Sequence, residues 1–310
     1  MDYSKLTEAI TEKTKAIIPV DIAGKICDYG RIYAAVESKK ELFYARNELQ
    51  RLFNRVIVMA DSAHGFGAER RSKKSGDMLK SGQFADFTCF SFHAVKNLTT
   101  AEGGAVVWRD VPGMDNEKIY HEFMLYSLHG QSKDALAKTQ KGAWEYDIIY
   151  PAYKCNMTDI LAGFGLIQLS RYEELLDRRC EIIDMYNKAL LPVDITSLQH
   201  YGEGFASTGH LYLARIPGIG EDERNKIIVK MAEAGIACNV HYKPLPMFTA
   251  YKNLGFDIQD YPNAYNQYAN EITLPLHTLL SNEDVEYVAE CLKKAMDEVL
   301  ESMKDLMQAV

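Results

Sequence analysis

The sequence predicts an α/β fold, in which short buried strands alternate with helical segments. Residues 56–60 form a continuous apolar run, which is typical of a strand that a parallel sheet buries on both faces. Residues 31–54 instead carry apolar side chains at helical spacing. Because strands that alternate with helices favour a parallel sheet covered by helices, we expect this class for the N-terminal half of the chain.

The remaining elements of the first domain follow in chain order. Strands are predicted at 15–22, 87–92 and 104–108, and helices at 117–128 and 156–190. The last helical stretch begins with small apolar residues and becomes strongly charged along its length. We interpret this change, near residue 175, as the passage into a second domain, so the predicted domains are 1–175 and 176–310. In the second domain, strands at 210–216 and 236–241 are expected to alternate with helices at 222–234 and 282–303.

Composition and charge exclude several classes of protein. The chain has 310 residues, of which 47% are hydrophobic and 25% charged, so it can bury a substantial core and is not disordered. A net charge of -8 argues against nonspecific binding to nucleic acid. The six cysteines form no C-x-x-C pair and no zinc-site spacing, which indicates reduced thiols in a cytoplasmic protein. No apolar run approaches the ~20 residues of a membrane helix.

One lysine stands in a turn between two predicted strands. Lys96 follows the apolar run 87–92, and a Glu102-Gly103-Gly104 hinge leads into the next strand. Asp61 ends the run 56–60, and ligands of α/β sheets bind at the carboxyl ends of strands. Pyridoxal phosphate (PLP) chemistry requires such a pair: the lysine forms an imine with the cofactor, and the acid keeps the ring nitrogen protonated. Taken alone, each residue is also compatible with a surface lysine or an aspartate that caps a turn.

The motifs around these two residues resemble those of a known enzyme family. The matching segments are Asp61-Ser62-Ala63-His64, the run from Ser91 to Leu98, Glu102-Gly103-Gly104, and also Lys15 to Val20, Tyr153 to Asp159, His241 to Leu245 and Leu274-Pro275-Leu276. In this order, from about Thr11 to about Met296, they resemble the DegT-type (DegT/StrS) sugar aminotransferases. The resemblance implies a PLP-dependent transferase of fold type I, with a large three-layer αβα domain and a smaller α+β C-terminal domain.

The resemblance also implies an activity and roles for further residues. The expected reaction is transamination of a nucleotide-linked keto sugar, with glutamate as the amino donor and a homodimer as the working unit. His64 would contact the phenolic oxygen or the ring face of PLP, and Ser91 its phosphate. Lys154 would reach the phosphate in the partner subunit, at a position where many relatives carry asparagine. His241 and Tyr242 match segments that approach the substrate. No metal is expected.

Two alternatives stay open at this point. The family normally carries a longer segment before the position at which this chain starts, so the chain is expected to be N-terminally truncated, with an incomplete large domain and uncovered apolar faces. The alternatives to an active aminotransferase are therefore a catalytically impaired fragment and a non-catalytic partner or regulatory protein of the same fold. A PMP-dependent sugar dehydratase is disfavoured, because such members carry histidine at the position of Lys96. A metal hydrolase that uses Asp61, His64 and His93 lacks a recognised ligand spacing.

Overall fold

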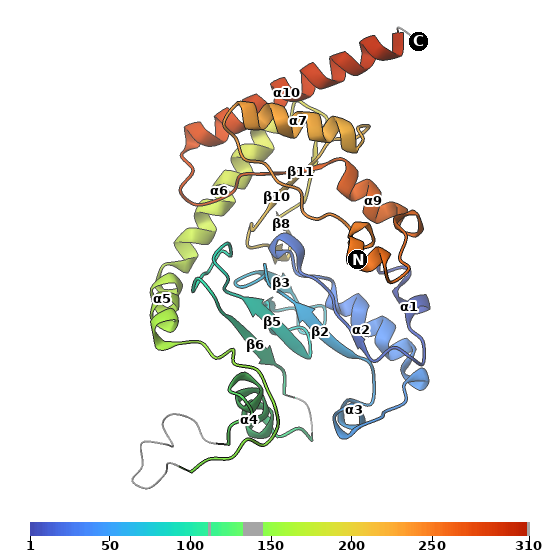
Figure 1. Cartoon of the computed structure of the whole chain (residues 1–310), viewed down its shortest axis with the longest axis vertical. Coiled ribbons are helices and arrows are strands. Elements are labelled where there is room, and N and C mark those ends of the chain that lie inside the picture. Colours follow the sequence, from blue (N-terminus) through green and yellow to red (C-terminus); the bar gives the residue numbers. More distant parts are fainter. Residues whose placement is uncertain (111–112, 133–144, 309–310) are drawn as a thin grey trace. The chain divides into compact units, whose positions relative to one another are not determined.

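The computed structural model describes residues 1–110, 113–132 and 145–308 (Figure 1). Contacts within the chain divide it into two compact units. The first unit contains Met1–Val20, Cys27–Ala63 and Ser72–Ser170, and the second contains Asp21–Ile26, His64–Arg71 and Arg171–Val310. The second unit therefore includes two short segments from the N-terminal part of the sequence. Because compact units need not coincide with independently folding domains, the boundary expected near residue 175 stays a prediction.

The first unit is built on a mixed sheet with strand order β1-β2-β5-β6. Its strands are β1 (Ala16–Ile17), β2 (Ile57–Asp61), β5 (Phe87–Ser91) and β6 (Gly104–Trp108). Strands β1, β2 and β5 run parallel to one another, and β6 is antiparallel to β5. The strand predicted at 15–22 is shorter than expected, since only an isolated bridge from Val20 to Asp61 continues it. Pro19 explains the interruption, because proline has no N–H group to donate to a ladder.

The helices of the first unit confirm one prediction and correct two. Those helices are α1 (Leu6–Ala9), α2 (Tyr29–Ser38), α3 (Glu48–Phe53), α4 (Asn116–Ser127) and α5 (Asp159–Ser170). The helix expected at 117–128 is confirmed as α4. The single helix predicted at 31–54 is wrong, because the side chain of Asn47 accepts the N–H of Gln50 and starts α3 as a separate helix. The stretch predicted at 156–190 is also two helices, because Arg171 has non-helical backbone angles.

Apolar surface is exposed on the first unit, as expected from the sequence. Helix α5 has no buried residue, and its Ile160 and Phe164 side chains are 75% and 61% exposed. A groove of about 530 Å³ runs between α3 and α4 over β2, where Leu52, Met59 and Phe123 line it. Isolated apolar side chains are common on protein surfaces, but a contiguous groove and an apolar helix without a buried residue are typical of interaction surfaces.

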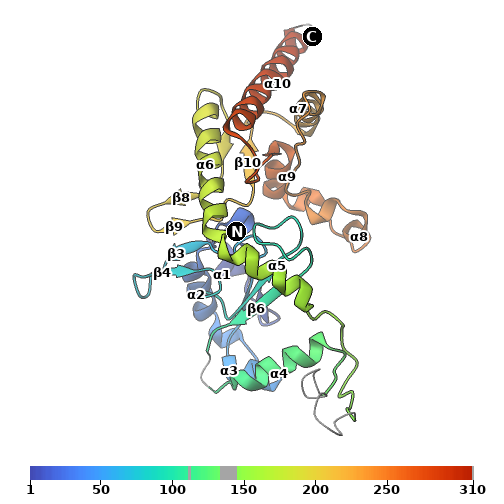
Figure 2. The same ribbon diagram turned by 90° about the vertical axis from the view of Figure 1, so that its left-hand side faces the viewer.

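The second unit contains a three-stranded antiparallel sheet and its covering helices. The strands have the order β11-β10-β7, with β7 (Thr196–Ser197), β10 (Tyr212–Arg215) and β11 (Glu271–Leu274). Its helices are α6 (Tyr172–Leu190), α7 (Glu221–Glu233), α8 (Thr249–Lys252), α9 (Pro262–Ala269) and α10 (Asn282–Gln308). Helix α10 packs against α6 and α7 (Figure 2). Three further short strands of this unit are β3 (Glu69–Arg71), β8 (Tyr201–Gly202) and β9 (Phe205–Ala206). The remaining short strand, β4 (Met78–Lys80), belongs to the first unit.

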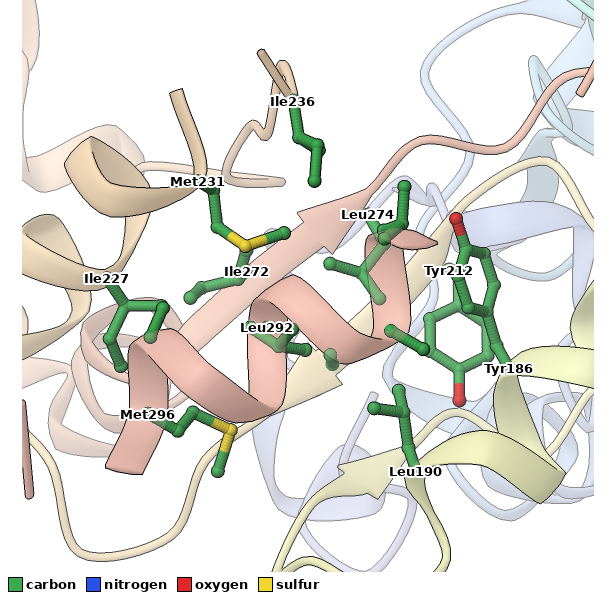
Figure 3. Packing of buried hydrophobic residues seen from close by; sticks show 14 of the residues in the cluster. Tyr186, Leu190, Tyr212, Ile227, Met231, Ile236, Ile272, Leu274, Leu292 and Met296 are labelled. Carbon is green, nitrogen blue, oxygen red and sulfur yellow. The ribbon is translucent and has the colours of Figure 1, made fainter. Parts of the chain in front are cut away.

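The core of the second unit fixes β10 and β11 in place. Figure 3 shows Ile272 and Leu292 packed with Met231 and Tyr212, and all four side chains are almost completely buried. Each such residue contributes roughly 1.5–3 kcal/mol by leaving water. Strand β10 and helices α7 and α10 confirm the elements predicted at 210–216, 222–234 and 282–303. The strand predicted at 236–241 is wrong, because only Asn239 forms a bridge there, to Thr273.

Candidate functional site

Strand pairing holds Asp61 at the carboxyl end of β2. Asp61 lies opposite Cys89 of the parallel strand β5, and its backbone N–H donates to the carbonyl of Pro19 over 2.9 Å. One carboxylate oxygen of Asp61 accepts the N–H of Ala63 over 3.1 Å. The next residue, Ser62, donates its N–H to the carbonyl of Cys89 over 2.9 Å, so the chain leaves the strand in a defined direction. The carboxylate is therefore held at the strand end where the sequence placed it.

The turn that contains Lys96 is closed by hydrogen bonds between its two arms. Phe92 donates its N–H to the carbonyl of Gly103 over 2.8 Å and accepts the N–H of Thr100 over 2.9 Å. Within the turn, the N–H of Lys96 donates to the carbonyl of His93 over 2.9 Å. Gly104 is required where β6 begins, because a Cβ atom there would lie 2.6 Å from the carbonyl oxygen of Phe90. Lys96 is thus a half-buried residue of a turn whose backbone is held by hydrogen bonds.

Electrostatics links Lys96 to Asp61 within the first unit. Burial lowers the pKa of the Lys96 ammonium below its ordinary value of 10.5, and the negative charge of Asp61 partly opposes this shift. Desolvation disfavours the charged form of an amine, so the neutral and nucleophilic form of Lys96 is more accessible than that of a free lysine. The structure therefore brings together the two residues that the sequence analysis paired.

Ser91 and Lys154, which were expected to contact phosphate, also lie in the first unit. The hydroxyl oxygen of Ser91 accepts the N–H of His93 over 3.3 Å and keeps its own hydrogen for donation. Lys154 is exposed and forms an isolated bridge with Leu128, next to the end of α4. Its ammonium group is hydrogen-bonded to the side chain of Asn156. Both are donors suited to a phosphate, and their roles stay predictions.

His64 belongs to the second unit and is held there by backbone contacts. Its ring is 9% exposed and lies 4.2 Å from the ring of His210 between centroids. The N–H of Ala23 donates to His64 Nδ1 over 3.2 Å, and the hydroxyl of Thr208 donates to the His64 carbonyl over 2.6 Å. Because Nδ1 accepts a hydrogen bond, the neutral ring carries its hydrogen on Nε2.

The two residues expected near substrate lie next to His64 in the same unit. The hydroxyl of Tyr242 is 3.3 Å from His64 Nε2, and the ring of Tyr242 meets that of His241 edge to face at 4.6 Å. His241 Nδ1 lies 2.8 Å from the hydroxyl of Thr273, which donates to the carboxylate of Glu271 over 2.6 Å. The structure thus groups His64, His241 and Tyr242, and it groups Asp61 with Lys96 in the first unit.

Glu271 and Thr273 were not found by sequence reasoning. A signal for them exists, because Glu271-Ile272-Thr273-Leu274 alternates polar and apolar side chains, and Glu271 places a carboxylate in a strand whose four residues are all buried. Among the described residues, no group of three His, Cys, Asp or Glu side chains is arranged to hold a metal ion. In the same part of the chain, no helix is both long and apolar enough to cross a membrane.

Comparison with known proteins identifies the family. The chain belongs to the DegT/DnrJ/EryC1/StrS aminotransferase family, whose family model matches residues 1–293. It is 31% identical over 299 residues to the spore coat polysaccharide biosynthesis protein SpsC of Bacillus subtilis, a match that covers 94% of this chain and 69% of SpsC. It is 29% identical to the UDP-4-amino-4,6-dideoxy-N-acetyl-beta-L-altrosamine transaminase of Campylobacter jejuni, over 96% of this chain and 71% of that enzyme.

Solved structures confirm the fold. The chain is similar to Spr1654 of Streptococcus pneumoniae in its PMP form, with 54% identity and a TM-score of 0.91 over 96% of this chain and 73% of that one. The PLP form of the same protein gives 52% identity and a TM-score of 0.89, over 96% and 72%. The fold is that of the PLP-dependent transferases of fold type I, as the motif resemblance implied.

Proposed function

We propose that this protein is a PLP-dependent aminotransferase that transfers an amino group from glutamate to a nucleotide-linked keto sugar. The observation that carries the proposal is the electrostatic interaction of Lys96, in the turn after β5, with Asp61, at the end of the neighbouring strand β2. The Campylobacter jejuni relative, named for a UDP-linked amino sugar, supports the choice of substrate class. The PMP and PLP forms of the Streptococcus pneumoniae protein support the cofactor.

The residues present fit PLP. Lys96 would hold the cofactor through its Nζ atom, Asp61 would pair with the ring nitrogen, and Ser91 would donate its hydroxyl to the phosphate. His64 would contribute its Nε2 hydrogen to the phenolic oxygen. When bound, PLP withdraws electrons from the carbon next to the transferred nitrogen. The Lys96 amine would take the proton from the α-carbon of the amino donor and deliver it to C4′ of the cofactor. In the sugar half-reaction it would carry a proton from C4′ to the sugar carbon, a task that needs an amine which readily loses its charge.

Covalent labelling of Lys96 tests the cofactor assignment. Borohydride reduction of the PLP-loaded protein, followed by peptide mapping, should place the label on Lys96. Lys96→Ala should abolish both the label and transamination while its circular dichroism spectrum stays unchanged. Lys25→Ala is the matched control, because burial also lowers the pKa of Lys25, in the second unit, and this lysine should be dispensable. A label on another lysine, or none with PLP in excess, contradicts the assignment and favours a non-catalytic partner protein.

The substrate class is tested by comparing matched amino acceptors and donors. A UDP-linked 4-keto sugar should yield 2-oxoglutarate from glutamate, and the corresponding free keto sugar should react far more slowly. Alanine and aspartate serve as alternative donors in the same assay. Equal rates with the free and the UDP-linked sugar would contradict recognition of the nucleotide, whereas faster transfer from alanine would contradict the choice of donor.

We further propose a homodimer in which Lys154 binds the phosphate in the partner subunit. The exposed apolar side chains of α5 support an interface between copies of this chain. Light scattering at micromolar concentration should give twice the mass of the chain. Mixed dimers of Lys96→Ala and Lys154→Ala subunits should regain activity, because one of the two shared sites then has both lysines. A monomer refutes the dimer, and mixed dimers no more active than either parent variant refute the shared site.

A further inference from the structure

His241 is connected through Thr273 to a buried carboxylate in the second unit. His241 Nδ1 lies 2.8 Å from Thr273 Oγ1, and Thr273 Oγ1 donates to Glu271 Oε1 over 2.6 Å. The other carboxylate oxygen, Glu271 Oε2, accepts the backbone N–H of His241 over 2.8 Å. Glu271 is fully buried and Thr273 is 5% exposed, so water does not compete for these contacts.

The chemistry of the three groups sets the direction of the hydrogen bonds. Above pH 7 the Glu271 carboxylate is ionised and only accepts, so the single hydrogen of the Thr273 hydroxyl is committed to Glu271. The Thr273 oxygen can then serve His241 only as an acceptor, which requires that Nδ1 carry a hydrogen. In the neutral imidazole the other nitrogen, Nε2, is left with its lone pair. His64 shows the opposite arrangement, because its Nδ1 accepts the N–H of Ala23.

The chain of contacts is not needed to attach the segment of His241 to the sheet. Asn239 already exchanges two backbone hydrogen bonds with Thr273, over 3.1 and 2.8 Å. A buried carboxylate is costly to keep, and burial raises the pKa of Glu271 to about 7 although Thr273, His241 and the charges of Arg224 and Arg215 oppose the shift. The charges of Arg224 and Arg215 stabilise the ionised carboxylate, whereas its two hydrogen bonds, from the Thr273 hydroxyl and the His241 backbone, couple it to His241.

We propose that Glu271 and Thr273 are positioning residues that hold His241 in its Nδ1–H tautomer, so that Nε2 accepts a hydrogen bond from a hydroxyl group of the sugar substrate. The choice of ligand follows from the nitrogen: a neutral acceptor binds a hydroxyl donor and offers nothing to a phosphate or a carboxylate. The hydrogen bond to a sugar hydroxyl rests on the proposed function, whereas the Nδ1–H tautomer of His241 does not.

Nitrogen-15 NMR of the imidazole rings tests the tautomer directly. The spectra are recorded at pH 8.5, about two units above the ordinary pKa of histidine, and His241→Gln assigns the His241 signals by their loss. The parent protein should show hydrogen on Nδ1 of His241. In Glu271→Gln, the amide oxygen takes over the hydrogen bond from the backbone N–H of His241, so the amide NH₂ group faces Thr273 and donates to its hydroxyl oxygen. The hydroxyl hydrogen of Thr273 then points to Nδ1 of His241. This variant should therefore move the hydrogen to Nε2.

Two further variants and an internal control complete the experiment. Thr273→Ser should preserve the Nδ1–H tautomer, and Thr273→Val should lose the preference. His200, whose Nδ1 is 2.6 Å from the hydroxyl of Ser207, should give unchanged signals throughout if the second unit stays folded. A parent protein with hydrogen on His241 Nε2 overturns the proposal even if every variant fails to fold. An unchanged tautomer in Glu271→Gln overturns it as well.

Steady-state kinetics tests the role in substrate recognition. Glu271→Gln and Thr273→Val should raise KM for the keto sugar about tenfold, while KM for the amino donor stays at the parent value. In Glu271→Gln the Nε2 atom of His241 carries a hydrogen and cannot accept, and in Thr273→Val the ring no longer prefers the accepting tautomer. Thr273→Ser should restore the parent KM. Equal losses for both substrates indicate a merely structural role and overturn the assignment. A parent protein without transamination overturns the proposed function and, with it, the sugar hydroxyl, whereas the NMR result still decides on the tautomer.

Discussion

Two buried groups of the second unit, His200 and Glu271, should make its stability respond to pH in opposite directions. His200 is 3% exposed, and burial, helped by the charge of Lys25, lowers its pKa from 6.5 to about 4. Burial raises the pKa of Glu271 from 4.5 to about 7. Burial widens the pH range over which each group is neutral in the folded state, because a buried charge is poorly solvated, and Glu271 is ionised only above about pH 7.

The signs follow from proton binding by the folded and unfolded chains. Below pH 6.5 the unfolded chain protonates His200 while the folded one does not, so stability is lost as the pH falls toward 4. Below pH 7 the folded chain protonates Glu271 before the unfolded one does. Its contribution is therefore fully present below pH 4.5 and is lost as the pH rises through 7. Each difference of about 2.5 pH units corresponds to roughly 3 kcal/mol.

The two effects should nearly cancel in the parent protein between pH 4.5 and 6.5. His200→Gln removes the loss at low pH, so the opening free energy of the second unit should increase by about 2–3 kcal/mol as the pH falls across this window. Glu271→Gln removes the opposing gain, so the same quantity should decrease by a similar amount. Relative to the parent, the two variants should thus show pH slopes of opposite sign.

Amide hydrogen exchange is the suitable assay, because the chain has two units and need not unfold in one step. Peptides that span β10 and β11 report on the second unit, and exchange rates corrected for the intrinsic effect of pH give the opening free energy. Peptides from β5, in the first unit, provide the control and should show the same pH dependence in all three proteins. If His200→Gln has the parent slope, the histidine is not held neutral by burial and the reasoning is refuted.

Three other substitutions test the packing and the candidate site. Leu292→Ala should destabilise the second unit by about 2–5 kcal/mol, read by exchange in β11, because it empties a fully buried position; a cost below 1 kcal/mol would contradict the described core. Asp86→Ala should destabilise the first unit by about 3–5 kcal/mol, because it leaves Arg55 without both of its 2.7 Å carboxylate contacts; unchanged exchange in β5 would show that the pair is dispensable. Asp61→Asn should retain PLP absorbance but lose most of the transamination rate, and a parent-like rate would exclude its role at the ring nitrogen.

The elements around Lys96 and Asp61 could be predicted because their signals are local. The run that became β2 is apolar at successive positions, and the hinge at Gly103 and Gly104 marks the start of β6. Strand ends of one sheet share an edge, so two short segments sufficed to pair the lysine with the aspartate. The family resemblance rests on the same segments and was confirmed by the comparisons.

Helix boundaries were predicted less well, for a physical reason. The cap by Asn47 and the break at Arg171 depend on backbone angles that interrupt a helix without interrupting its apolar periodicity. Periodicity therefore predicted single helices where the chain forms two. Pro19 shortened the first strand in the same way, because the loss of one N–H group changes the ladder without changing hydropathy.

By itself, the sequence determined the fold class, the family motifs and the pairing of Lys96 with Asp61, because each is written in consecutive or regularly spaced residues. Only the tertiary structure decided which polar groups meet at long range. His241 and Glu271 are 30 positions apart, and Tyr242 and His64 are 178 apart. No period in the sequence encodes such contacts. The contact of His241 with Glu271 exists because β11 buries a carboxylate, which then needs hydrogen-bond donors from the elements packed around it.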